Sequence, residues 1–239
     1  MHPIPQTQAR NLILSALPEE EYNRLLPELE PVKMQLGEII HQPNERIKYV
    51  HFPQNSIVSS VTFLKDGTSV EAGIVGREGT TGVSVALGRE TSPRQLSVQS
   101  AGDCLRIKVD KFRAALKQLE VLEALVRQHI SAFVSQTSQI IACNAHHSID
   151  ERLARWLLMT QDRVESEELN LTQEFMAQML GVHRPGVTLA ALSLKEAGII
   201  DYRRGNITIC DRAGLKEISC ECYGVIKGEY DSYLNAINH

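Results

Sequence analysis

Hydrophobic and polar residues alternate in short runs through residues 31–108, a pattern typical of half-buried β-strands. We expect strands at residues 36–40, 49–52, 57–64, 69–75 and 96–107. Between two of these runs, Asp66 and Gly67 form a dipeptide that favours a tight hairpin turn. Short strands at this spacing predict an antiparallel β-barrel or jelly roll, whose interior can hold a small ligand.

The pattern changes after residue 103, because residues 103–180 contain neither Gly nor Pro. Residues 121–145 predict one continuous helix, about 38 Å long at the usual rise per residue. Its apolar positions recur every three or four residues in a stripe made of Val126, His129, Ile130, Phe133, Thr137 and Ile140. Such a stripe favours pairing with the same helix of a second copy; packing on the chain's own barrel is the alternative. His129 is a candidate ligand or pH sensor, although a hydrogen-bonded core or interface histidine is more common.

A second helix is expected directly after the first. Ser148 and Glu151 have the spacing of a capping box, in which two residues satisfy each other's exposed amides. We therefore place a domain boundary near residues 146–148 and a helix over residues 152–160, with Trp156 as a core anchor. The acidic residues 162–170 are expected to form a loop.

Residues 173–192, with the sequence QEFMAQMLGVHRPGVTLAAL, have the spacing of a helix-turn-helix. Ala177 allows the two helices to approach closely, and Gly181 suits the left-handed backbone that ends the first helix. Val187 anchors the second helix in a shared apolar core. A plain helical hairpin is the alternative, because one match of this kind also occurs by chance. A true helix-turn-helix makes double-stranded DNA the expected partner.

The next residues support DNA binding. Gly198 is expected to cap the second helix, and residues 199–210 contain two alternating apolar runs around a turn, which predicts a β-hairpin. A hairpin directly after a helix-turn-helix makes a winged helix. Arg203 and Arg204 lie near its tip, where a wing would meet phosphate; a merely solvated turn is the alternative.

Charge limits how such a protein could hold DNA. The chain has 239 residues, enough for two domains with separate cores, and a formal net charge of -4. Residues 172–210 contain four basic and three acidic residues, a net of only one positive charge. Specific contacts and dimerisation, rather than a strong general field, would therefore have to supply the affinity.

The five cysteines are an odd number and mostly scattered, so no disulfide framework is implied. Cys220 and Cys222 form a CxC pair, which could bind a metal or sense redox state. Without a second pair or a suitably spaced histidine we predict structural thiols, and neither a metal site nor a catalytic site. The absence of a long apolar run predicts a cytoplasmic protein with no membrane partner.

The order of these elements resembles the Crp/Fnr family of bacterial transcription regulators, from about Leu17 to Tyr223. The resemblance is carried by LGEII at residues 36–40, SVEAGIVGREG at 69–79, ERLARWLL at 151–158, the helix-turn-helix, and DRAGLKEISCECY at 211–223. It implies an α+β fold in three parts. These are a cyclic-nucleotide-binding-like jelly-roll barrel at residues 1–120, a dimerisation helix and hinge at 121–147, and a winged helix-turn-helix at 148–239.

The residues that would hold an effector depart from the family pattern. Cyclic-nucleotide binders of this kind use a Gly-Glu turn and a later Arg-Ser/Thr-Ala sequence to hold phosphate and ribose. The corresponding positions here are Gly79, Thr80, Thr81 and Arg94, without that Glu and without the residues that should follow the arginine. We therefore expect an effector other than cyclic AMP, or none, and the cofactor is unknown. Residues 1–103 contain no cysteine, which closes the iron–sulfur route, whereas haem stays open.

The resemblance also places the DNA contacts. It begins the recognition helix around His183 and puts Arg184 where a base-contacting arginine stands, suited to guanine in the major groove. Pro185 and Gly186 replace residues that many relatives use for hydrogen bonding. The further expected contacts are Thr172, Thr188, Leu189, Arg203 and Arg204.

The predicted function is a homodimeric, sequence-specific DNA-binding transcription regulator that meets RNA polymerase and possesses a sensor barrel. A ligand-responsive protein-interaction module without DNA binding is one alternative. The other is an enzyme of the cupin type, but the barrel lacks the His-x-His pair that such metal sites commonly use, and we predict no enzyme.

Overall fold

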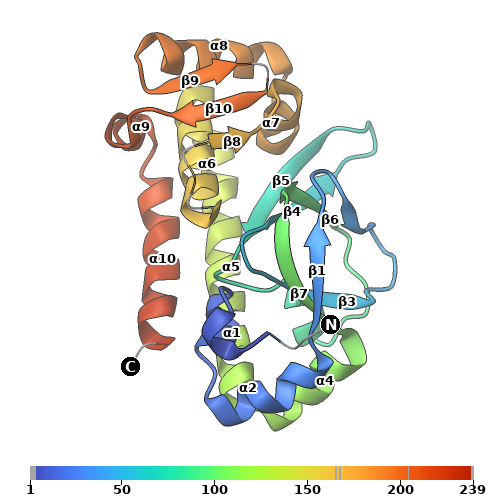
Figure 1. Ribbon diagram of the computed structural model, residues 1–239. Coiled ribbons are helices and arrows are strands. Elements are labelled where there is room, and N and C mark those ends of the chain that lie inside the picture. Colours follow the sequence, from blue (N-terminus) through green and yellow to red (C-terminus); the bar gives the residue numbers. More distant parts are fainter. Residues whose placement is uncertain (1–3, 165, 167, 204, 238–239) are drawn as a thin grey trace. The chain divides into compact units, whose positions relative to one another are not determined.

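The computed structural model describes residues 4–164, 166, 168–203 and 205–237 (Figure 1). By internal packing the chain forms two compact units. The first comprises Met1–Ser60, Ile74–Val134 and Tyr230–His239, and the second comprises Val61–Gly73 and Ser135–Glu229. Helices α5 (Glu120–His146) and α10 (Cys222–Ile237) each contribute residues to both units, and residues 61–73 belong to the second.

Two antiparallel sheets build the barrel. One has the strand order β1-β7-β3 and the other β2-β6-β4-β5, as the jelly-roll prediction requires. The strands are β1 (Glu30–Met34), β2 (Ile39–His41), β3 (Tyr49–Pro53), β4 (Ile57–Phe63), β5 (Ser69–Val75), β6 (Gln95–Ser100) and β7 (Gly102–Lys108). Their inward side chains, including Phe52, Ile57 and Ile107, are fully buried. The predicted turn between β4 and β5 is present, with Gly67 at a φ of 87°.

Three strand predictions need correction. The strand expected at residues 36–40 is β2, which begins only at Ile39, after a turn at Leu36 and Gly37. The run 96–107 is not one strand but the pair β6 and β7, which part at Ala101. Strand β1 was not predicted at all, because Pro31 and charged residues interrupt its pattern. Proline is more readily tolerated there because β1 lies at the edge of its sheet and pairs with only one neighbouring strand.

Short helices complete the first unit. They are η1 (Gln6–Gln8), α1 (Leu12–Ser15), α2 (Glu19–Leu25), η2 (Leu26–Glu28), α3 (Val83–Ala86) and α4 (Val109–Gln118). Helix α4 buries Phe112, whose ring packs edge-on against Phe52 of β3 at 6.1 Å between centroids. No helix within the described residues combines the length and hydrophobicity needed to cross a bilayer.

Helix α5 confirms the predicted continuous helix, but its apolar stripe lies inside the chain. Val126, His129, Phe133 and Ile140 are buried, and Ile130 and Thr137 are half-buried. These side chains pack within the chain itself, which is the alternative that the sequence left open. The exposed face begins one residue further along, where Val134 is 57% and Ile141 66% exposed.

The second unit contains α6 (Ile149–Val164), β8 (Glu168–Asn170), α7 (Gln173–Leu180), α8 (Arg184–Glu196), β9 (Ile200–Arg203), β10 (Asn206–Ile209), α9 (Arg212–Ile218) and the first half of α10 (Cys222–Ile237). The capping box is formed: the Ser148 amide donates to Glu151 at 2.8 Å, and the Glu151 amide donates to Ser148 at 3.3 Å. The acidic segment expected to be a loop instead provides β8, which completes a sheet of order β8-β10-β9. Pairing of Leu169 with Ile207, both buried, stabilises that strand despite its charged flanks.

Candidate nucleic-acid interface

The turn between α7 and α8 has the geometry that its sequence predicts. Thr172 caps α7, since its hydroxyl accepts the Phe175 amide at 3.2 Å. Gly181 ends the helix in the left-handed region, at φ 61° and ψ 41°. His183 is the N-cap residue of α8, which begins at Arg184. Met176, Ala177, Leu180 and Val187 are buried between the helices, so the unit is a helix-turn-helix with a packed core.

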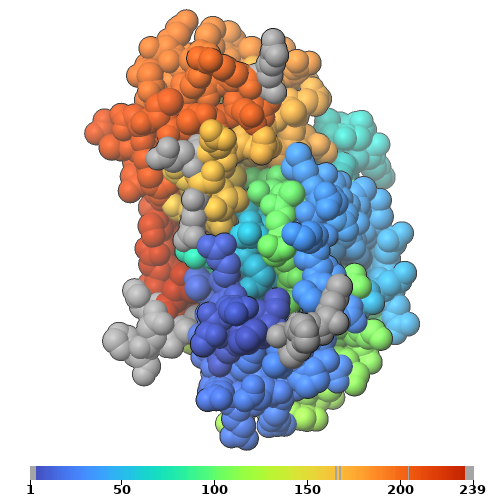
Figure 2. Space-filling model, in the orientation of Figure 1, coloured from blue at the N-terminus to red at the C-terminus, as the bar shows by residue number. Residues whose placement is uncertain are grey.

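One face of α8 lies at the surface, where its orange segment is visible in the space-filling view (Figure 2). Arg184, Pro185 and Leu189 are exposed, and Leu189 reaches 68%. Pro185 occupies the first helical turn, where its missing amide has no intrahelical partner to lose. The exposed guanidinium and leucine are therefore positioned to meet a ligand rather than the protein core.

Two other predicted contact residues have packing roles that the sequence did not indicate. The Thr188 hydroxyl lies 2.9 Å from Gln173 Oε1 and 3.0 Å from the Arg184 carbonyl, so it links α8 to α7. A Cβ added at Gly186 would lie 2.7 Å from the Ile149 side chain, which would have to move. Glycine thus allows the start of α8 to approach the start of α6.

The wing hairpin β9–β10 is formed, with Asn206 paired to Arg203 and Gly205 at a φ of 88°. The Arg203 side chain is 81% exposed, and its Nε lies 2.8 Å from Asp201. Lys195, which the sequence analysis did not single out, lies 2.8 Å from the same carboxylate. Its hydrogen bond, and then the charge of Arg203, lower the pKa of Asp201. Arg204 lies outside the described residues.

Buried polar contacts support the helix-turn-helix from within the second unit. Arg152 donates to the Leu180 carbonyl, which belongs to the last turn of α7. Trp156 is fully buried, as predicted, and its indole nitrogen donates to Glu71 at 2.9 Å. A Cβ added at Gly181 would lie 3.0 Å from Val70. The tip of the β4–β5 hairpin therefore contacts the turn between α7 and α8.

The expected effector turn is occupied by the protein itself. Gly79 and Thr80 are buried, and the Thr80 amide donates to Nε2 of His129 at 3.3 Å. A Cβ added at Gly79 would lie only 2.1 Å from Cε1 of the same ring. The Thr80 hydroxyl donates to the His51 carbonyl at 2.9 Å. A phosphate bound to this turn would have to displace His129 and compete for Thr80.

The remaining predicted effector residues also make contacts within the chain. Thr81 accepts the His51 amide at 2.9 Å, and the guanidinium of Arg94 lies 5.4 Å from the centre of the Phe133 ring. Burial lowers the pKa of Arg94. The barrel does contain a cavity of about 800 Å³, but it is lined elsewhere, by residues that include His41, His51 and Arg106.

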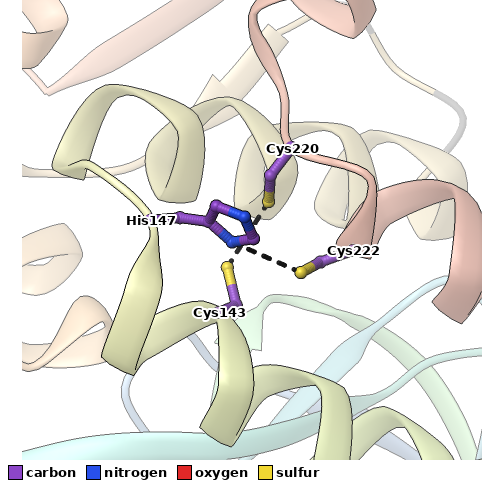
Figure 3. Close-up of side chains that lie close together, drawn as sticks. All are labelled: Cys143, His147, Cys220 and Cys222. Carbon is purple, nitrogen blue, oxygen red and sulfur yellow. Dashed lines mark hydrogen bonds between the residues drawn. The ribbon is translucent and has the colours of Figure 1, made fainter.

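A third group of side chains lies at the end of α5. Cys143, His147, Cys220 and Cys222 place one donor atom each within 4.8 Å of all the others (Figure 3). The three cysteines are buried. Donation from Cys220, and then the charge of Arg155, lower the pKa of Cys143, whereas the pKa of Cys220 is raised. From the sequence, Cys220 and Cys222 are candidates because of their CxC spacing, whereas Cys143 and His147, which lie beside them, are not.

Comparison with known proteins identifies one domain of the chain. Residues 151–218 match the Crp-like helix-turn-helix domain, whereas no curated protein matches the chain.

The fold extends further than that domain. A Crp/Fnr-family regulator from Eubacterium rectale ATCC 33656, described as putative, is 18% identical, with 86% of this chain and 96% of that chain covered at a TM-score of 0.67. FixK2 from Bradyrhizobium japonicum is 15% identical, with coverages of 80% and 98% and a TM-score of 0.69. A CRP-family transcriptional regulator from Thermus thermophilus is 18% identical, with coverages of 79% and 96% and a TM-score of 0.67.

The class of protein that this domain and fold define is a DNA-binding transcription regulator. More particularly, the chain carries a Crp-like helix-turn-helix in the fold of Crp/Fnr regulators, which confirms the family resemblance and the α+β fold predicted from the sequence.

Proposed function

We propose that the protein is a homodimeric, sequence-specific transcription regulator in which Arg184 reads a base in each half-site. The observation that carries this proposal is the exposed first turn of α8, held on a packed helix-turn-helix. A guanidinium at that position can donate two hydrogen bonds to guanine in the major groove. Leu189 offers an apolar contact for a thymine methyl group, while the wing adds Arg203 to the phosphate contacts.

Dimerisation is proposed through the exposed face of α5 rather than the buried stripe. Ser131, Val134, Ser138, Ile141 and Ala145 are exposed and follow one another at alternating intervals of three and four residues. This is the spacing of a two-helix coiled-coil seam, here made of small and apolar side chains. A second copy of α5 would cover it and present two recognition helices to successive half-sites.

The sensor barrel is proposed to respond to something other than cyclic AMP. His129 covers the turn that would bind phosphate, and Thr80 already donates its hydroxyl within the chain. RNA polymerase as a further partner and a cytoplasmic location complete the proposal as predictions from the sequence.

Selection of bound sequences from a pool of random duplexes tests the proposal. We expect one enriched palindromic site, and Arg184→Ala should weaken binding to it by about 1–3 kcal/mol and relax the preference at one base position. Arg89→Ala, which removes an exposed arginine of the barrel, is the matched control. Enrichment of no sequence would favour the protein-interaction module, and equal preferences of Arg184→Ala and the parent would remove Arg184 as the reader.

The dimer is tested separately by sedimentation. Val134→Glu with Ile141→Glu should convert the dimer to monomer, because two charges would replace the two large apolar side chains of the seam. Val225→Glu, at a position on α10 that is 47% exposed, should leave it intact. Persistence of the dimer in the double variant would place the interface elsewhere.

A further inference from the structure

Four metal-ligating side chains converge in the second unit from two separate segments. Cys143 lies in the last turn of α5, and His147 follows four residues later, so both point to one side of the helix axis. Cys220 and Cys222 lie where α9 leads into α10. None of these four residues takes part in the DNA contacts proposed above.

The distances match one four-coordinate ion. Sγ of Cys143 and Sγ of Cys220 are 3.5 Å apart, and Sγ of Cys222 lies 3.5 Å from Nδ1 of His147. In a tetrahedral zinc site, bond lengths of about 2.3 Å to sulfur and 2.0–2.1 Å to nitrogen separate two sulfurs by about 3.8 Å, and sulfur from nitrogen by about 3.6 Å. The set is therefore nearly assembled. It is too compact for a cluster of several irons, which would hold the sulfurs further apart.

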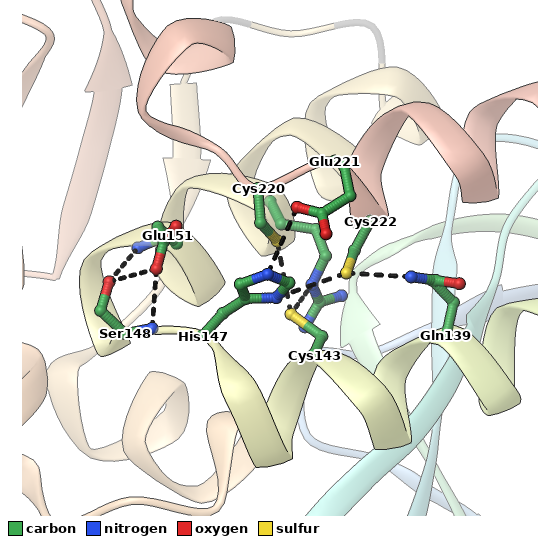
Figure 4. A network of polar contacts seen from close by, with 9 residues as sticks. Gln139, Cys143, His147, Ser148, Glu151, Cys220, Glu221 and Cys222 are labelled. Atoms are coloured by element: carbon green, nitrogen blue, oxygen red, sulfur yellow. Dashed lines mark hydrogen bonds and ion pairs between the residues drawn. The ribbon is translucent and has the colours of Figure 1, made fainter.

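Surrounding side chains complete the arrangement. Glu221 lies 3.3 Å from Nε2 of His147, whereas Nδ1 of the same ring is the nitrogen that contacts Cys222 (Figure 4). A carboxylate in this position fixes the tautomer that leaves Nδ1 free to bind a metal. Gln139 donates to Cys222 at 3.1 Å, and Arg155 donates to Cys143 at 3.2 Å. Both are hydrogen bonds that stabilise thiolates.

Charge balance also favours a divalent ion. Three thiolates and Zn²⁺ carry a net charge of -1, which the guanidinium of Arg155 neutralises. Arg155 is 2% exposed, and its other described side-chain contact is also with sulfur, that of Met159 at 3.2 Å. A buried guanidinium facing sulfur atoms needs an anionic partner, and a zinc-bound thiolate provides one.

We propose that Cys143, His147, Cys220 and Cys222 bind one structural Zn²⁺. Four protein ligands leave no open position, which distinguishes a structural site from a catalytic one. Binding forms three Zn–S bonds and one Zn–N bond and releases the thiol protons to solvent, with no change in oxidation state. The ion would join the end of α5 to the start of α10, two segments that are far apart in the sequence.

Metal analysis of the full-length protein tests this proposal directly. The protein is purified under reducing conditions without immobilised-metal chromatography, after growth with added zinc. We expect close to one zinc per chain by elemental mass spectrometry. Reloading the metal-free protein with Co²⁺ should give the visible bands of a tetrahedral thiolate site. A chain that holds neither zinc nor cobalt would overturn the proposal, and so would an intact mass showing a Cys143–Cys220 disulfide.

Variants assign the ligands. Cys143→Ser and Cys222→Ser should each lose most of the zinc, whereas Cys210→Ser, which removes an exposed cysteine after β10, should retain one equivalent. Where a ligand variant fails to fold, His147→Cys keeps four ligands and should retain zinc with a shifted cobalt spectrum. Full zinc content in Cys143→Ser and Cys222→Ser, or an unchanged cobalt spectrum in His147→Cys, would contradict the assignment.

Discussion

His129 and His147 belong to the same stretch of chain, yet their surroundings differ in chemical kind. His129 is fully buried among the Gly79–Thr80 backbone and the rings of Phe133, Tyr230 and Tyr233, with ring centres 6.2–6.5 Å away. His147 is half-buried, between sulfur atoms on one side and a carboxylate on the other. The first environment consists of backbone and aromatic rings and bonds Nε2 to the backbone of Thr80, whereas the second contains thiols and a carboxylate and leaves one nitrogen suited to a cation.

Burial alone therefore does not identify a metal ligand. From the sequence, His129 is the histidine on an apolar stripe and therefore the one that attracts a functional interpretation. The structure gives it a packing role, and the chemistry lies with the histidine that follows the helix. Neighbouring donor atoms, rather than position on a stripe, distinguish the two.

The largest expected effect comes from substituting each histidine in turn. His147→Ala should weaken zinc binding by more than about 100-fold, because it removes a ligand from a closed site. His129→Ala should leave the zinc content unchanged, although it opens a cavity beside Gly79. Competition with a chromophoric chelator measures both affinities, and equal losses in the two variants would erase the distinction between the two sites.

A third histidine, His51 of β3, is a reference for a histidine with a purely structural role. Burial, and then the charge of Arg106, lower its pKa to about 4 from the usual 6.5. As the pH falls, the unfolded chain therefore binds this proton before the folded chain does. The contribution of His51 to the free energy of unfolding is present above pH 6.5 and is lost as the pH falls towards 4, by up to about 3 kcal/mol. Urea unfolding at about pH 7 and about pH 4.5 should show a smaller loss of stability in His51→Gln than in the parent. An equal loss would exclude His51 as its source.

The smallest effects concern the contact between Gly79 and His129. Gly79→Ala should lower the free energy of unfolding by about 1–3 kcal/mol, because the new methyl group would overlap the imidazole. Gly224→Ala in α10, where nothing lies within 4 Å of an added Cβ, is the control. It should raise stability by about 0.5–1 kcal/mol by reducing the freedom of the unfolded chain. Chemical denaturation of both variants checks the opposite signs.

Local signals predicted the DNA-binding unit well, because its residues act on near neighbours. The spacing of Gly181 and Val187, the Ser148 capping box and the wing alternation all concern contacts within a few residues, and all are confirmed. Strand β8 was missed because only its pairing with β10 outweighs its acidic flanks. The stripe on α5 was found, but whether a barrel or a second copy covers it is a tertiary property.

The thiol cluster could not be predicted from the CxC pair, since its other members come from a distant segment. Cys143 and Cys220 are separated by 77 positions, and nothing in either segment indicates that α5 and α10 meet there. The four-residue interval between Cys143 and His147 was the available signal. The expected effector turn is a second case that the sequence predicts only in part. The sequence shows which phosphate-binding residues are absent, but not that His129 lies against this turn.

Asp201 has a consequence for the way the wing would meet DNA. One carboxylate holds both Lys195 and Arg203, so part of their positive charge is already offset within the chain. If the wing contacts DNA as proposed, a phosphate would compete with Asp201 for these two cations. The gain from each contact would then depend on how closely the docked phosphate replaces the carboxylate, as well as on charge.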